Sequence, residues 1–153
     1  MSRRAGLLLL VLAAAACKGQ PTEREQAEAV IRDLQRSHVD ANVPTEADFD
    51  RLLRRDLTGY FTRLRNAPVE ASYELLRESP TQSGIAFPKY YLWIRLGPGG
   101  QPKDRGAVRV AAIQGERFEV TDFLSEEDIR QGARIEQVFP EPVCERIRGL
   151  MGR

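Results

Sequence analysis

Apolar side chains follow a helical spacing in the first half of this chain and an alternating spacing in the second half. They recur every three or four residues up to about residue 65, and every second residue within segments 87–96, 106–113 and 118–124. The first spacing predicts amphipathic helices and the second predicts strands. Because the two kinds of element are segregated, we predict an α+β fold, with N-terminal helices packed on a curved antiparallel sheet of three to four strands.

Both predicted N-terminal helices carry start signals. Thr22 and Glu25 have the spacing of a capping box, in which each side chain accepts a hydrogen bond from the backbone N–H of the other residue. The helix that begins there gathers its apolar side chains on one face: Ala27, Val30, Ile31 and Leu34. A second helix begins at Thr45 and continues to about Arg65, with the most strongly amphipathic pattern in the chain.

The later elements are less uniform. Residues 71–78 fit either a strand or a helix, and we expect a strand because a clear β-region follows. Ser125 has the position of an N-cap for a short helix, and Pro142 lies at the first position of a terminal helix. Residues 126–153 are therefore expected to form a helical C-terminal extension, which is placed to cover the open face of the sheet.

Residues 1–16 have the three parts of a secretory signal peptide. Arg3 and Arg4 supply the charged start, residues 5–16 are uncharged, and small side chains end the run. The 12 uncharged residues form about 18 Å of helix, well short of the ~30 Å hydrocarbon core of a bilayer. A signal peptide is therefore expected in place of a permanent transmembrane helix.

The leader ends in AAAC (residues 14–17), which resembles the lipobox of bacterial lipoproteins. The resemblance implies that Cys17 is the lipid-attachment site, with acyl chains such as palmitate that anchor the protein in the cell envelope. Lys18, where inner-membrane lipoproteins have Asp, implies the outer membrane. Ala14 departs from the usual leucine, and with Ala16 it also fits ordinary secretory cleavage, which would leave Cys17 as a free thiol.

The remaining chain has the size and charge of one soluble domain, expected over residues 22–153 behind a short linker of residues 17–21. Without the leader, 21 basic side chains balance 22 acidic ones, and this balance excludes a nucleic-acid-binding surface. The chain has no Cys-x-x-Cys motif, histidine pair, phosphate-binding loop or Gly-x-Ser-x-Gly motif, so we expect no metal and no cofactor.

Cys144 is the second cysteine of the mature chain. If Cys17 is lipidated, Cys144 has no disulfide partner and is expected to be a buried, small apolar side chain. If ordinary cleavage occurs, a bridge between Cys17 and Cys144 is an open alternative.

A helical first half, a long aromatic strand and a final hairpin resemble the nuclear transport factor 2-like superfamily over roughly residues 22–125. The segments that carry the resemblance are YYLWI (90–94), GAVRV (106–110) and ERFEVTDFL (116–124). It implies a conical cavity between helices and sheet, which such proteins use for small ligands, catalysis or protein contacts. The C-terminal extension is additional to that pattern, and a cystatin-like or other small helix-on-sheet fold is the alternative.

Two residues are candidate catalytic bases. His38, the single histidine, lies on the same side of its helix as Ile31 and is able to face a cavity; the alternative is a capping or solvent-exposed histidine. Asp122 falls on the inward side of the last strand by alternation with Phe118; the alternative is an ion pair with an arginine. Tyr73, Tyr90 and Trp93 are candidates for the lining of an aromatic pocket, or else core residues.

The leading hypothesis is a non-catalytic envelope lipoprotein, bound to the membrane through acyl chains on Cys17, whose domain binds a protein partner or an apolar ligand. One alternative is a small-molecule enzyme that uses Asp122 or His38 as its base. A third hypothesis is an assembly protein that dimerises through the sheet face bearing Tyr91 and Trp93. The oligomeric state is left open.

Overall fold

The computed structural model describes residues 21–97 and 104–152. The predicted signal peptide, Cys17 and Lys18 lie outside these residues, as does the connector 98–103. The elements in chain order are α1 (Glu23–Asn42), α2 (Glu46–Arg65), β1 (Ala71–Leu75), β2 (Lys89–Leu96), β3 (Arg105–Ile113), β4 (Arg117–Ser125), α3 (Glu126–Arg130), the 3-10 helix η2 (Ile135–Gln137) and α4 (Glu141–Met151).

The four strands form one antiparallel sheet in the order β1-β2-β3-β4, with two helices before it and short helices after it. This arrangement confirms the predicted α+β class and the predicted strand at β1. Gln114 and Gly115 both take positive φ angles and form the tight turn between β3 and β4.

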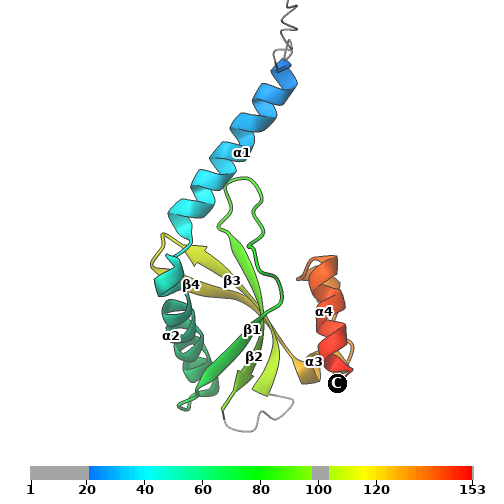
Figure 1. Ribbon diagram of the computed structural model, residues 1–153. Helices are drawn as coiled ribbons and strands as arrows, with labels where there is room; N and C mark the ends of the chain where they lie inside the picture. The colour runs from blue at the N-terminus through cyan, green and yellow to red at the C-terminus, as the bar shows by residue number, and fades with distance from the viewer. Residues whose placement is uncertain (1–20, 98–103, 153) are drawn as a thin grey trace, which may run out of the picture.

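Helix α2 covers one face of the sheet (Figure 1). Its Leu53, Leu57 and Phe61 are completely buried against the strands. The sheet side of this core comprises mainly Tyr90, Leu92, Ile94, Val108, Val110 and Phe118. Burial of one such side chain contributes roughly 1.5–3 kcal/mol, so this interface supplies a large share of the stability. These side chains fill the space between helix and sheet, where the resemblance to the nuclear transport factor 2-like superfamily implies a cavity.

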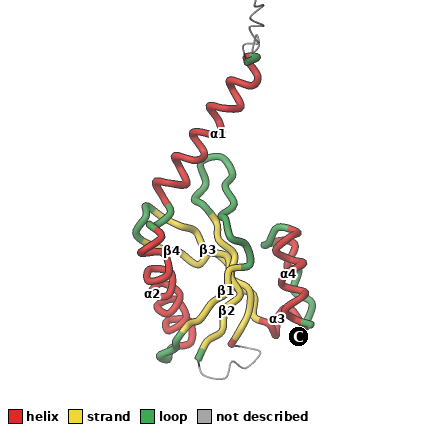
Figure 2. Tube along the Cα trace, in the orientation of Figure 1, coloured by secondary structure: helices red, strands yellow, loops and turns green. Residues whose placement is uncertain are grey.

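The C-terminal segment covers the opposite face of the sheet (Figures 1 and 2). Tyr91 and Trp93 project from β2 into a second core, where they are only 4% and 3% exposed. Helix α4 contributes Val143, Cys144 and Ile147 to this core. The sheet is therefore enclosed between two helical layers. The prediction that Tyr91 and Trp93 present an open face for dimerisation is wrong, because the C-terminal extension covers them.

Helix α1 projects from the body as a stalk (Figure 1). Residues 23–34 are all exposed except Ala29, which is half-buried. At the other end, the buried Asn42 fixes the helix to the β3–β4 turn: its Oδ1 accepts from the Gln114 N–H at 3.0 Å, and its carbonyl accepts from the Gly115 N–H at 2.9 Å. A helix of 20 residues is about 30 Å long, so α1 sets the body apart from the linker.

Candidate functional site

His38 lies near the base of the stalk, half-buried against the loop that joins β1 to β2. Its ring stacks on Phe87 with 6.4 Å between ring centroids and 21° between ring planes. Nε2 is buried and has no hydrogen-bond partner among the described residues. Neither ring nitrogen is hydrogen-bonded to an acid or phenol of the described chain, whereas a catalytic histidine needs such a group to orient its ring. His38 does line a groove, but the walls of that groove are apolar.

A β-bulge decides the side of the sheet on which Asp122 lies. The register passes from Val110 opposite Val120 to Arg109 opposite Asp122, so that Thr121 is an extra residue in β4. The alternation of faces shifts there by one residue, and Asp122 lies on the α4 side and not on the predicted α2 side. Arg109 binds its carboxylate through Nε at 2.7 Å and Nη2 at 2.5 Å. The alternative prediction, an ion pair with an arginine, is confirmed.

The ion pair of Asp122 and Arg109 supports the packing of the C-terminal segment. Arg109 Nη1 donates to the carbonyl of Val138, directly after η2, at 3.1 Å. Burial and the nearby Arg109 together lower the pKa of Lys89. Asp122 and His38 thus contact different partners, and the structure does not bring the two candidate bases together as an acid–base pair.

Trp93 lies on the opposite face of the sheet from Tyr73 and Tyr90, so the prediction that the three line one pocket is wrong. Tyr90 is buried on the α2 side of the sheet, edge-to-face with Phe118, whereas Trp93 is buried on the α4 side. Tyr73 lies on β1, where its hydroxyl donates to Asp50 Oδ1 at 2.8 Å. Burial and this hydrogen bond raise the pKa of Tyr73 to about 12. The three rings are therefore structural residues.

An exposed apolar surface joins the stalk to the β1–β2 loop. Six large hydrophobic side chains are exposed among the described residues, and five of them lie here: Val30, Ile31, Leu34, Ile85 and Phe87. Scattered exposed hydrophobic residues are normal in proteins, but a gathered set of this kind indicates a binding site. We call these five residues the stalk patch.

The stalk patch borders an open groove of about 370 Å³ between α1 and the β1–β2 loop. Ile31, Leu34 and His38 form the helical wall of the groove, and Ile85 forms the loop wall. In Figure 1 the loop rises beside the middle of α1, which brings the two walls together. Two segments that are far apart in the sequence therefore form the groove together.

Hydrogen bonds within the β1–β2 loop (residues 76–88) hold Ile85 at its tip. Thr81 and Lys89 exchange two backbone hydrogen bonds of 2.9 Å across the base of the loop. Gln82 Nε2 donates to two loop carbonyls at 2.9 and 2.5 Å, and Gly84 takes a φ of +55° that L side chains rarely adopt. Ile85 is 93% exposed as a result. The hydrogen bonds of the loop thus hold an apolar side chain in contact with solvent.

Sequence reasoning missed Ile85 and Phe87 as members of a site. The available signal was the presence of two large apolar side chains inside a segment of turn-forming residues. The apolar face of the first helix was predicted, but its exposure was not.

Cys144 is completely buried, and its thiol donates to the Phe139 carbonyl at 3.2 Å. Burial raises the pKa of this thiol. The prediction of a buried, small apolar residue is confirmed, whereas a bridge to Cys17 involves a residue outside the described ranges. Over residues 21–97 and 104–152, no cluster of three or more His, Cys, Asp or Glu side chains is arranged to hold a metal ion.

Comparison of the chain with protein-family models, with curated proteins and with solved structures finds no match. The resemblances to lipoproteins and to the nuclear transport factor 2-like superfamily therefore stay predictions. None of the helices in the described part of the chain has the length and apolar content that a membrane crossing requires. The functional argument rests on the stalk patch and its groove.

Proposed function

We propose that this chain is a lipid-anchored cell-envelope protein that binds a protein partner through the stalk patch and catalyses no reaction itself. The lipobox-like residues 14–17 support an anchor at Cys17, and Lys18 supports placement in the outer membrane. The observation that carries the proposal is the uncovered apolar face of α1, which begins only a few residues after the anchor.

An uncovered face is costly for a helix of this kind, because most helical stability in proteins comes from packing of the apolar face. The capping box of Thr22 and Glu25 fixes the start of α1, but such a cap contributes only about 1 kcal/mol. Covering Val30, Ile31 and Leu34 would contribute roughly 1.5–3 kcal/mol for each side chain. A partner on the stalk patch therefore stabilises the stalk as well as the complex.

The dimensions of the surface favour an amphipathic helix of a partner protein as the occupant. Pockets for small apolar ligands bury roughly 70–90% of the ligand, whereas Ile85 at this groove is itself 93% exposed. A coiled coil between two copies needs at least three heptads, whereas the apolar face from Ala27 to His38 covers only about 17 Å of helix. A partner helix laid between α1 and the loop contacts both apolar walls.

Site-specific photocrosslinking in the cells that express the full chain tests this proposal. A photoreactive benzoylphenylalanine is placed at position 31, 34 or 85, and at Glu145 on the exposed side of α4 as the control. We expect one crosslinked protein from the three patch positions and none from the control position. Mass spectrometry should locate the crosslink on a segment whose apolar residues have helical spacing.

A second variant makes this test specific. Leu34→Asp, combined with the photoreactive residue at position 85, should abolish the product, because a carboxylate is then placed in the apolar groove. Crosslinks to a second copy only, to lipid only, or to nothing from all three patch positions would contradict a partner helix in the groove.

The anchor has an independent test. Labelled palmitate should enter the wild-type chain and not the Cys17→Ala variant, and the mature N-terminal peptide should have the mass of an acylated cysteine. An unmodified N-terminal Cys17 would refute the lipid anchor and leave the stalk-patch proposal standing.

A further inference from the structure

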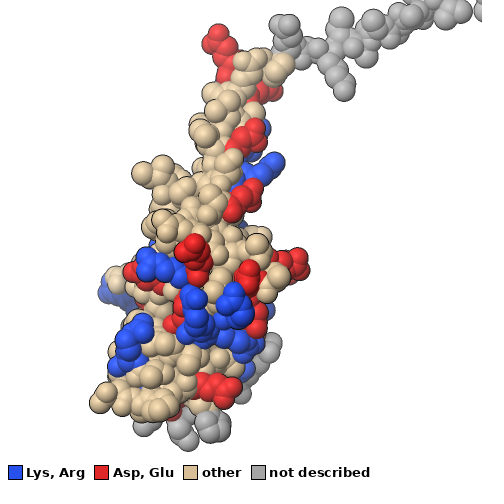
Figure 3. Space-filling model, turned by 90° about the vertical axis from the view of Figure 1, so that its left-hand side faces the viewer, with Lys and Arg blue, Asp and Glu red and all other residues tan. Residues whose placement is uncertain are grey.

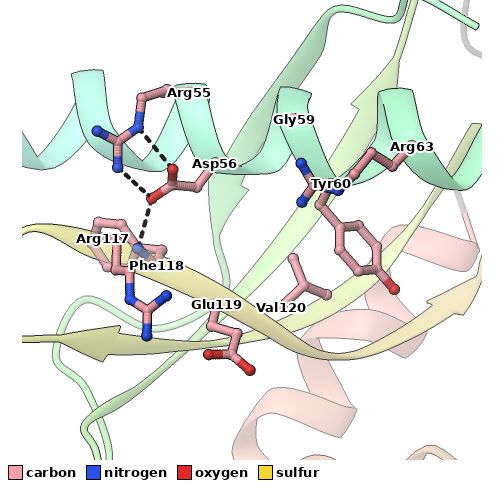
Figure 4. A pocket seen from close by; sticks show the side chains of 9 residues that line it. All are labelled: Arg55, Asp56, Gly59, Tyr60, Arg63, Arg117, Phe118, Glu119 and Val120. Carbon is pink, nitrogen blue, oxygen red and sulfur yellow. Dashed lines mark hydrogen bonds and ion pairs between the residues drawn. The ribbon is translucent and has the colours of Figure 1, made fainter.

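A second groove, of about 700 Å³, runs between α2 and the edge of β4 on the body of the protein. Figure 4 shows its two walls, one from the helix and one from the strand. Its lining comprises Arg55, Asp56, Gly59, Tyr60 and Arg63 from α2, and Arg117, Phe118, Glu119 and Val120 from β4. This edge groove shares no lining residue with the groove beside the stalk.

The strand wall is a free sheet edge. Strand β4 pairs with β3 alone, so alternate backbone groups of β4 point away from the sheet. The Phe118 N–H is one of these groups, and it donates to Asp56 Oδ2 at 2.7 Å. Val120 is two residues further along and therefore presents its backbone to the same edge. Because the Phe118 N–H is already bound to Asp56, the backbone of Val120 is the part of this edge that an added strand can pair with.

The charge of the edge groove favours an anionic occupant. Arg55 is committed to Asp56 and to the Glu116 carbonyl. Arg63 and Arg117 are both exposed, and neither has an ion pair or hydrogen bond from its guanidinium to another described residue. Figure 3 shows Lys and Arg side chains over the body on this side of the molecule, interspersed with Asp and Glu side chains. The groove thus has two guanidinium groups without a partner among the described residues, Arg63 on the α2 side of β4 and Arg117 on the opposite side, and two carboxylates, of which Asp56 is paired with Arg55.

The length of the edge groove favours a peptide over a small anion. Its helical wall extends from Arg55 to Arg63, which is about 12 Å of α-helix. Roughly four residues of extended chain span this length. At the middle of the wall Gly59 has no side chain, and a Cβ atom added there would have Arg63 Nη1, 3.5 Å away, as its nearest neighbour. The Arg63 guanidinium therefore lies over Gly59, where it is placed to meet a carboxylate of a bound peptide.

We propose that the edge groove binds an extended acidic peptide segment of a partner protein, which adds as a fifth strand beside β4. Its backbone pairs with the edge at Val120, and its carboxylates bind the guanidinium groups of Arg63 and Arg117. Side chains of an extended strand alternate between the two faces of a sheet, so carboxylates at adjacent peptide positions bind Arg63 on the α2 side and Arg117 on the opposite side. This inference depends neither on the lipid anchor nor on the stalk patch.

The test uses the probe peptide Glu-Glu-Glu-Glu-Glu-amide, labelled with fluorescein on its N-terminal amine, titrated with the purified full chain and followed by fluorescence polarisation. We expect saturable binding at low salt that weakens as NaCl is added, because these charges are exposed. The matched peptide with Gln in place of Glu should bind at least tenfold more weakly. Methylation of the central backbone amide should weaken binding to a similar degree, since it removes a main-chain donor.

Matched protein variants separate this site from general charge attraction. Arg63→Gln with Arg117→Gln should weaken binding of the acidic peptide at least tenfold. Arg77→Gln with Arg95→Gln removes the same charge at the β1 side of the sheet and should leave binding unchanged. Leu34→Asp, in the stalk patch, should also leave it unchanged.

Amide hydrogen exchange distinguishes strand pairing from simple charge attraction, because charge attraction alone does not protect a backbone N–H. The Val120 N–H should become protected when the acidic peptide is bound. Equal binding of the Glu and Gln peptides, competition by inorganic phosphate as strong as by the peptide, an unprotected Val120 amide, or no binding at low salt would each overturn the proposal.

Discussion

Gly106 lies where β3 passes closest to the end of β4. A Cβ atom at this position would be 2.2 Å from the carbonyl oxygen of Leu124 and 2.8 Å from the Cα of Ser125. Both are backbone atoms that cannot rotate away, so β4 would have to move by roughly 1 Å. Ser125 is also the N-cap of α3, and its movement would disturb that helix start. Gly106→Ala should lower the free energy of unfolding by about 1–3 kcal/mol.

Gly59 provides the opposite case. It lies inside α2, and a Cβ atom there would meet only Arg63 Nη1, at an ordinary contact distance of 3.5 Å. Glycine inside a helix costs about 0.5–1 kcal/mol relative to alanine, because its unfolded backbone is freer. Gly59→Ala should therefore raise the free energy of unfolding by this amount. The same substitution is thus expected to have opposite signs at the two positions.

Equilibrium urea unfolding of the two variants and the wild type measures both effects. Trp93, the single tryptophan, reports the transition by fluorescence, because it is buried between the sheet and α4. The urea dependence of the unfolding free energy should be the same for all three proteins, so that midpoint shifts report stability. A wild-type midpoint for Gly106→Ala, or shifts of the same sign for both variants, would refute the inference from the backbone distance at Gly106.

Three other residues carry predictions of stability. Asn42→Ala should lower the free energy of unfolding by about 1–3 kcal/mol in the same urea assay, because the Gln114 N–H at the β3–β4 turn loses its acceptor. Glu126→Gln should lower it by up to about 3 kcal/mol, since Glu126 is 3% exposed and ion-paired with two arginines that still reach water. The pKa of Tyr73 is raised from 10.0 to about 12, so its stabilising contribution is present below pH 10 and lost as pH rises to 12. Absorbance titration of Asp50→Asn should place this pKa below the wild-type value, because the hydrogen bond to the carboxylate is gone.

Most of the element boundaries could be predicted because they depend on local signals. The capping box at Thr22 and the N-cap at Ser125 form as predicted, and each fixes the first residue of a helix. Thr45 also precedes a helix, but its side chain accepts no capping hydrogen bond and donates to Asp48 Oδ2 at 3.0 Å. The helix begins there all the same, because its apolar face packs on the sheet.

The face on which Asp122 lies could not be predicted, because a β-bulge depends on how two strands pair. The extra residue is Thr121, which has good β-propensity and gives no local sign of an interruption. A strict alternation from Phe118 therefore places the residues after the bulge, from Asp122 onward, on the wrong face. Asp122, which the sequence pattern places on the inward face, instead forms an ion pair with Arg109 on the opposite face.

The sequence does contain a sign that both faces of the sheet are covered, although an interpretation by strict alternation of faces overlooks it. Residues 90–94 are YYLWI, an apolar run without a polar position, and all five are buried in the structure. Continuous runs of this kind are typical of strands that are buried on both faces. The run therefore favours a second covering layer, and the C-terminal extension supplies it with Val143, Cys144 and Ile147.

The exposure of α1 could not be predicted from the spacing of its apolar residues, because it depends on the direction in which the helix leaves the body. An apolar stripe has the same spacing whether it packs on its own domain or on a partner. What separates the two cases here is the end of the helix, where Asn42 holds it against the β3–β4 turn and directs the preceding turns away from the sheet. The stalk patch is thereby held apart from the edge groove on the body. Because the two surfaces share no lining residue, a partner helix and an acidic strand can bind at the same time. Leu34→Asp should then abolish only the first contact, and Arg63→Gln with Arg117→Gln only the second.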